Sequence, residues 1–135
     1  MYTGFKELLV DRIQSHPSLA TAGLAEGAIY RADVVYDIVD HEEFLVFRFG
    51  EPTTRMGNSM IIPWDILGYC GTGNNDSMKR IAAAARNVAE SLAPEETVSG
   101  RFTTAEFVGI GADQFDVGFK SIVLVTHMRC VASGY

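Results

Sequence analysis

The sequence predicts a single α+β domain covering residues 1–135. Two stretches, Thr3–Ser15 and Asn75–Leu92, repeat apolar residues at the three- and four-residue spacing of a helix with one buried face. Other stretches alternate apolar and polar residues with the two-residue period of a strand. Nearly half of the residues are hydrophobic, which is enough to form a core at this length.

The first helix is expected from Thr3 to about Ser15, and Pro17 is expected to end it because the residue before proline avoids helical geometry. Residues Ser18–Gly27 are small and irregular, which indicates a connector, and Ile29–Val39 is a possible extended segment. The predicted buried face of the helix consists of Phe5, Leu8, Leu9 and Ile13.

The middle of the chain predicts two strands separated by a long turn. Phe44–Phe49 alternates cleanly, and Asp65–Cys70 is a second strand. The intervening Gly50–Ser59 is rich in turn residues and predicts a long hairpin loop or a protruding arm. Pro63 predicts an edge or a bulge, since proline cannot donate to a strand ladder.

An alanine-rich helix follows, with Asn75, Asp76 or Ser77 able to cap its amino end and Pro94 ending it. Its small side chains allow close approach to a sheet. One continuous apolar stripe runs along it: Met78, Ile81, Ala82, Ala85, Val88, Ala89 and Leu92.

The last third is predicted to be β structure. Phe102–Ile110 is one strand, Gly111–Gln114 is a turn, and Phe119–Val131 is another strand. Apolar residues occupy both faces of this last strand, so part of it should be covered on both sides.

Composition excludes several classes of function. The formal charge of −6 and scattered basic residues argue against tight nucleic-acid binding. No stretch approaches a membrane span, and the beginning of the chain lacks a signal-peptide pattern, so we expect a protein made in a cytosol. Cys70 and Cys130 have neither zinc nor redox spacing and are expected to be buried free thiols.

No motif predicts a catalytic, cofactor or metal site. Gly71-x-Gly73-x-x-Asp76 resembles a dinucleotide loop, but Asp76 replaces the third glycine and would repel a pyrophosphate. The acidic run Asp37–Glu43 contains His41 but lacks a calcium-loop pattern, which favours a solvated loop or a contact with a basic partner. His127 lies among hydrophobic residues, where a hydrogen-bonded sheet histidine is expected.

The loop before the second strand offers a candidate subunit interface. Methionine adapts well to interfaces, and exposed methionine is unusual. The candidate interface residues are Met56, Met60 and Ile61, in an arm that packs either on a neighbour or on its own core.

Taken in order, these elements resemble the tail terminator proteins of long-tailed bacteriophages. The resemblance covers nearly the whole chain: helix Phe5–Ile13, strand Phe44–Gly50, strand Trp64–Cys70, helix Lys79–Leu92 and strand Ile122–Cys130. It implies an antiparallel four- to five-stranded sheet with two helices on one face, plus a protruding hairpin arm. The turn Gly50–Ser59 is longer than is usual in that family.

The resemblance also implies a function. Such proteins are virion structural proteins, not enzymes. They form a homohexameric ring at the head-proximal end of the tail, stop tube polymerisation, and contact the major tail tube protein and the head-completion (stopper) protein. They are assembled in the host cytoplasm, and DNA passes through the ring without specific binding. Acids that could line such a lumen are Asp40, Glu42, Glu43, Glu95, Glu96, Asp113 and Asp116, although solvation of the outer surface explains them equally.

Two other functions stay open at this point. One is a head-closure, connector or other minor tail protein, a group in which β-barrels are commoner. The other is a small α+β ligand-binding domain or enzyme, which would need a pocket with convergent polar groups.

Overall fold

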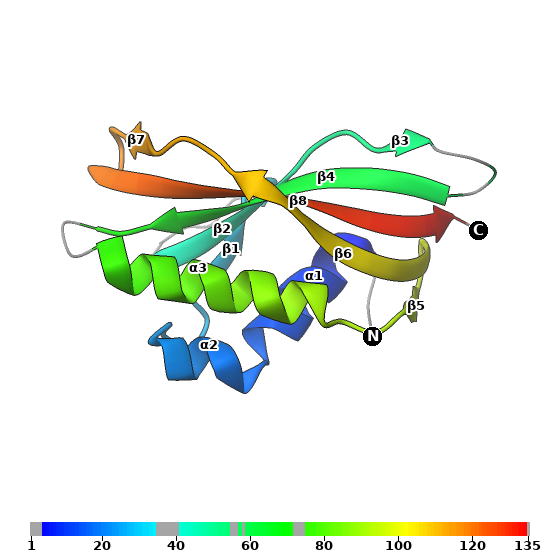
Figure 1. Ribbon diagram of the computed structural model, residues 1–135, viewed down its shortest axis with the longest axis horizontal. Coiled ribbons are helices and arrows are strands. Elements are labelled where there is room, and N and C mark those ends of the chain that lie inside the picture. The colour runs from blue at the N-terminus through cyan, green and yellow to red at the C-terminus, as the bar shows by residue number, and fades with distance from the viewer. Residues whose placement is uncertain (1–3, 35–40, 55–56, 58, 72–74, 135) are drawn as a thin grey trace.

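The structure is a computed structural model that describes residues 4–34, 41–54, 57, 59–71 and 75–134. Within these residues three helices lie on one side of a curled sheet (Figure 1). The elements in chain order are α1 (Phe5–Gln14), α2 (Pro17–Ala22), β1 (Ile29–Arg31), β2 (Phe44–Phe49), β3 (Thr53–Thr54), β4 (Ser59–Tyr69), α3 (Asn75–Glu90), β5 (Glu95–Thr97), β6 (Gly100–Ile110), β7 (Gln114–Asp116) and β8 (Ser121–Gly134).

The sheet has eight strands in the order β1-β2-β4-β8-β6-β5, with β3 attached to β4 and β7 attached to β8. It is mixed, because β1 runs parallel to β2 with Ile29 opposite Leu45. The expectation of a purely antiparallel sheet of four or five strands is therefore wrong. Parallel neighbours need a crossover of about a dozen residues, and residues 32–43 supply that length between β1 and β2.

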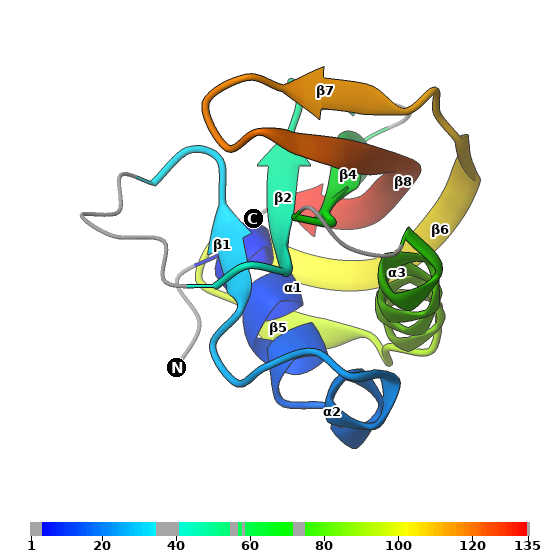
Figure 2. The same cartoon turned by 90° about the vertical axis from the view of Figure 1, so that its left-hand side faces the viewer.

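A third helix, α2, occupies part of the segment expected to be an irregular connector. Pro17 ends α1 but also begins α2, since proline fits the first turn, where its missing N–H is not needed. The Nδ1 atom of His16 accepts a hydrogen bond from the backbone N–H of Ser18 at 3.1 Å. Gly23 ends the helix with a left-handed φ of 108°. Figure 2 shows α2 packed below α3, so three helices rather than two lie on this side.

The helix-on-sheet prediction is confirmed for α3. Ile81, Ala85 and Val88 are buried, and α3 contacts β4, β6 and β8. Leu92 lies beyond the end of the helix and is only partly buried. The α1 face of Phe5, Leu8, Leu9 and Ile13 is also buried as predicted.

Pro63 lies inside β4 rather than at an edge or a bulge. It is opposite Arg129 of β8, and its carbonyl accepts a hydrogen bond from the N–H of Gly50 at 2.8 Å. The N and C=O of one strand residue point to the same side, so the missing N–H faces Gly50, just past the end of β2. The ladder to β8 therefore loses nothing.

The expected arm folds back on its own strand where it is described. Thr53 and Thr54 form β3 opposite Ile61 and Met60 of β4. Residues 55, 56 and 58 lie outside the described residues.

Strand β8 is buried on both faces where Val123, Leu124, Val125 and Thr126 follow one another, as predicted. Cys70 and Cys130 are free and buried, also as predicted. In the part of the chain that is described, no helix combines the length and the apolar character needed to cross a lipid bilayer.

Candidate subunit interface

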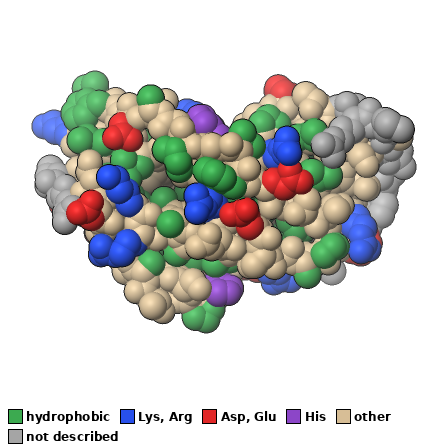
Figure 3. Space-filling view, viewed as in Figure 1, with side chains coloured by type: hydrophobic (Ala, Val, Ile, Leu, Met, Phe, Trp, Pro, Cys, Tyr) green, Lys and Arg blue, Asp and Glu red, His purple; other side chains and the backbone are tan. Residues whose placement is uncertain are grey.

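The hairpin of β7 and β8 carries a group of exposed apolar side chains at one end of the sheet. Val117 is 78% exposed and Phe115 is 63% exposed. Phe115 pairs across the ladder with Ile122, which is also exposed, and Phe119 lies in the turn between them. We call Phe115, Val117, Phe119 and Ile122 the β7 surface; Figure 3 shows hydrophobic side chains gathered at this end, at the upper left.

The turn that presents these side chains is built from local hydrogen bonds. The backbone N–H of Phe119 donates to Oδ1 of Asp116 at 3.1 Å, and the hydroxyl of Tyr69 donates to Oδ2 of the same carboxylate at 3.0 Å. Lys120 completes the turn with a φ of 51°, in the left-handed region. Asp116 therefore holds the hairpin to the body of the sheet.

Aromatic packing anchors the base of the hairpin. The ring of Tyr69 stacks on that of Phe44 at 4.5 Å between centroids, and the ring of Phe119 meets both edge-on. The pKa of Tyr69 is raised to about 12, mainly by burial and to a smaller extent by the hydrogen bond to Asp116. One side of Phe119 is thus fixed while the other remains open to solvent.

The exposed fractions of its side chains give the approximate apolar area of the β7 surface. A fully exposed phenylalanine side chain presents about 200 Å² to solvent. On that basis the four side chains of the β7 surface together expose on the order of 400 Å². The largest exposed apolar patch of a typical soluble monomer is about 300–600 Å² and is often functional. The β7 surface is therefore a candidate contact surface.

A groove lies at the opposite end of the sheet, between the beginning of α1 and the β2–β4 region. Its volume is about 520 Å³. Phe49, Pro52 and Met60 supply much of its apolar wall, with Phe5 and Ile62 deeper. We call it the α1–β3 groove. Lys6 stands 5.5 Å from the centre of the Phe49 ring on its rim.

The open face of the sheet between these two ends is polar. Asp65 accepts a hydrogen bond from Arg48 at 2.8 Å, and its other oxygen lies 2.6 Å from Nδ1 of His127. Arg129 donates to Glu106 at 2.6 Å on neighbouring strands. The expectation of a hydrogen-bonded sheet histidine at position 127 is confirmed. Paired charges therefore occupy this open face between the two ends.

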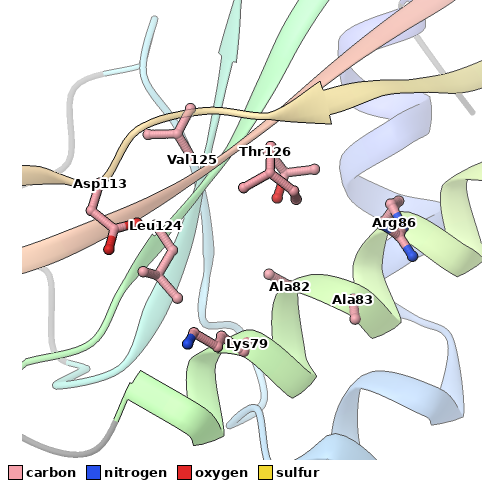
Figure 4. A pocket seen from close by; sticks show the side chains of 9 residues that line it. Lys79, Ala82, Ala83, Arg86, Asp113, Leu124, Val125 and Thr126 are labelled. Carbon is pink, nitrogen blue, oxygen red and sulfur yellow. The ribbon is translucent and has the colours of Figure 1, made fainter.

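A smaller pocket of about 230 Å³ lies between α3 and β8 (Figure 4). Lys79 and Arg86 reach it from the helix, and Asp113 from the loop after β6. The guanidinium of Arg86 already stacks 4.5 Å above the ring of Phe107. The pocket is smaller than the roughly 300–1,000 Å³ typical of ligand sites, and its lining is mostly apolar. Among the described residues, no group of three His, Cys, Asp or Glu side chains could hold a metal ion.

The sequence-predicted interface residues fall at the groove end. Met60 lines the α1–β3 groove, and Ile61 is half-buried beside it in β4. Met56 lies outside the described residues. Their role as interface residues stays a prediction.

The candidate lumen acids divide into two groups, and Asp40 lies outside the described residues. Burial raises the pKa of the Cys70 thiol, and the charges of Glu43 and Asp113 raise it further. Both carboxylates therefore lie near Cys70, at the β7 end of the sheet. Glu42 packs on Gly71 at the same end, and Asp116 holds the turn.

Glu95 and Glu96 lie on β5, at the far end of β6. Glu95 accepts from Arg12 at 3.0 Å, and Glu96 accepts from Arg101 at 2.9 Å. A strand of eleven residues spans roughly 35 Å, so the two groups of acids cannot form one cluster.

Sequence reasoning did not find the β7 surface. The signal was present in Phe115, Val117 and Phe119, three apolar residues separated by the turn formers Asp116 and Gly118. Apolar residues inside a turn segment are costly to expose, and their presence there indicates a contact.

Comparison with known proteins gives a structural match. No protein-family model and no curated protein sequence matches this chain. A solved chain does match in fold. It belongs to a structure described as the virion of a native gene transfer agent particle, with a TM-score of 0.68. The alignment covers 93% of this chain and 92% of that chain at 14% sequence identity. The two chains thus share a fold over nearly their whole length.

Proposed function

We propose that this protein is a virion structural protein that closes the end of a phage-like tail tube as a homohexameric ring. The observation that carries the proposal is the fold shared with a chain of a gene transfer agent virion over 93% of this sequence. The helices and strands on which the resemblance to tail terminator proteins rests support the proposal, since each corresponds to an element of the structure. A structural role also gives a use to the exposed β7 surface.

In this proposal the ring stops tube polymerisation and provides the surface for head attachment. Its partners are the major tail tube protein on one face and the head-completion protein on the other. The polar ladder of Arg48, Asp65 and His127 and the apolar ends offer chemically different surfaces for these contacts. The protein would reside at the head-proximal end of the virion tail.

DNA passes through the ring in this proposal, and the acids near β7 are the better lumen candidates. Among the described residues Glu43 and Asp113 form no ion pair, whereas Glu95 and Glu96 are paired with arginines. An unpaired carboxylate keeps its full field and repels phosphate, while a paired one is largely neutralised. A repelling wall lets DNA slide, since attraction of several kT would retain it.

The test is removal of the coding sequence from the particle-producing genome, followed by electron microscopy of the products. The proposal expects tails of irregular, excessive length without heads, and normal tails when the gene is restored. Normal-length tails that fail to join filled heads would instead identify a head-closure or connector protein. Complete, infectious or transducing particles would refute a virion role.

The pocket between α3 and β8 is the feature that an enzyme or ligand-binding function would use. Replacing Lys79 and Arg86 by methionine removes its cationic groups while keeping much of their volume. The tail proposal expects normal particle assembly from this variant.

A further inference from the structure

The β7 surface and the α1–β3 groove lie at opposite ends of strand β8. The hairpin strand β7 pairs with Ser121–Val123, at the beginning of β8. Met60 in the groove is opposite Ala132, near the end of β8. Eleven strand residues separate these points by roughly 35 Å, so one copy cannot fill its own groove with its own hairpin. Figure 1 shows β7 and β3 at opposite ends of the sheet.

The two surfaces are complementary in shape and polarity. The β7 surface is a hairpin that projects from the sheet, with Val117 and Phe115 as its most exposed side chains. The α1–β3 groove is concave, with Phe49, Pro52 and Met60 in its apolar wall and a volume of about 520 Å³. A volume of several hundred Å³ accommodates a drug-sized group, and therefore two apolar side chains.

Their charges are also complementary. Lys120 follows Phe119 directly on the hairpin, and Glu51 lies on the rim of the groove next to Pro52. Both side chains are exposed, and neither forms an ion pair with any described residue, although ten ion pairs occur elsewhere in this part of the chain. Each apolar surface thus carries an unpaired charge of opposite sign.

We propose that the β7 surface of one copy docks in the α1–β3 groove of the next copy of this chain, with Lys120 facing Glu51. The contact is head-to-tail, because the two surfaces are different, and a head-to-tail contact generates a ring when the rotation closes. This inference rests on the proposed ring and specifies its subunit contact. It also places Met60, an interface candidate from the sequence, on the receiving side.

The area is consistent with a stable contact. A specific interface buries about 800 Å² per partner, of which somewhat more than half is apolar. The β7 surface supplies on the order of 400 Å² of apolar area. Pairing of two β7 surfaces would bury the same side chains but would bring two Lys120 cations together and leave the groove uncovered, so the second copy's groove is the favoured occupant.

Cross-linking of mixed cysteine variants tests the contact. Phe115→Cys and Pro52→Cys proteins are purified separately, mixed at millimolar concentration, and treated with a short bismaleimide. The native thiols stay out of the reaction, since both are buried and burial raises the pKa of Cys130 to about 12. Phe115→Cys mixed with Glu26→Cys, an exposed position near α2, is the matched control.

The proposal expects dimers from the mixture and none from either variant alone or from the control. Dimers from Phe115→Cys alone would overturn it in favour of hairpin pairing. Absence of any cross-link in the mixture would also overturn it. Circular dichroism before treatment verifies that these exposed substitutions leave the fold intact.

A charge swap gives a second readout. Lys120→Glu and Glu51→Lys each place like charges in the contact and should reduce the cross-link yield about two- to fivefold, the range of an exposed ion pair. Combining Lys120→Glu on one partner with Glu51→Lys on the other should restore the yield. If both single variants lose cross-link yield and the combination does not restore it, Lys120 and Glu51 do not face each other in the interface.

The failure of this inference and that of the proposed function are distinguishable. A protein with both Phe115→Cys and Pro52→Cys should give a ladder of cross-linked species ending at the ring number. A ladder that ends at a number other than six refutes the hexamer but supports the docking. Irregular tails after gene removal, together with no cross-link, would support the tail function and refute the docking.

Discussion

Substituting Gly68 by alanine should destabilise the protein through one contact between the sheet and α3. Gly68 lies in β4 between Leu45 and Leu124 on neighbouring strands. A methyl group built on it would stand 2.7 Å from Cγ and 2.8 Å from Sδ of Met78. Met78 is fully buried in α3. Its Cγ is close to the backbone, so this part of the side chain cannot simply swing away.

The magnitude follows from two opposing effects. Inserting a methyl group into a packed core costs about 1–3 kcal/mol. Replacing glycine by alanine in a regular element gains about 0.5–1 kcal/mol from reduced freedom of the unfolded chain. Overpacking wins, and we expect a net loss of about 0.5–2 kcal/mol. At this chain length a loss of 1 kcal/mol lowers Tm by about 3–5 °C.

Urea unfolding followed by circular dichroism measures the effect as a lower midpoint at unchanged slope. Gly109→Ala is the matched control, since Gly109 is also in a strand but has no atom within 4 Å of an added methyl group. It should be neutral or slightly stabilising. Adding Met78→Ala to Gly68→Ala should show a coupling of about 0.5–3 kcal/mol. If Gly68→Ala is as stable as Gly109→Ala, the helix does not press on the sheet at this point.

Three further predictions concern the core, the hairpin and the charge. Ile81→Ala removes a fully buried side chain and should cost about 2–5 kcal/mol, whereas Leu92→Ala, which is only partly buried, should cost clearly less; equal losses in thermal unfolding would contradict this packing. The pKa of Tyr69 is raised from 10 to about 12, so the unfolded chain releases this proton first as pH rises. Unfolding free energy should therefore decline between about pH 10 and 12, and Tyr69→Phe should flatten that part of the profile. Reversing Glu43 and Asp113 to lysine should leave tail length normal but slow DNA delivery; delivery at an unchanged rate would reject the lumen argument.

The helices and strands with strong local periodicity were predictable from the sequence. The strand Phe44–Phe49 has the predicted bounds, and the apolar stripe of α3 is buried along the helix. These features depend on neighbours within one turn or one ladder step, which the sequence displays directly. The same local signals ended the first helix correctly before Pro17 but missed α2 and misplaced Pro63. Pro17 also begins a helix, and Pro63 lies in a paired strand because its missing donor faces the end of β2.

The candidate interface was only partly predictable. Met60 was selected from the sequence and lines the groove, but the β7 surface was missed. An apolar residue in an alternating segment is normally buried, and whether it is covered depends on elements far along the chain. Phe119 illustrates this dependence on distant elements. One side of its ring packs on Phe44 and Tyr69, yet the residue stays 49% exposed.

The sequence by itself determined the helices α1 and α3 and the strand β2, the apolar face of each helix, and that both thiols are buried and free. Each of these follows from residue type and spacing within a segment. Only the tertiary structure decided that β1 joins the sheet in parallel and that the acids fall into two separate groups. It alone showed that an apolar hairpin and an apolar groove remain uncovered at opposite ends of β8. Exposure is a property of non-local neighbours, and a local pattern carries no information about which neighbours arrive.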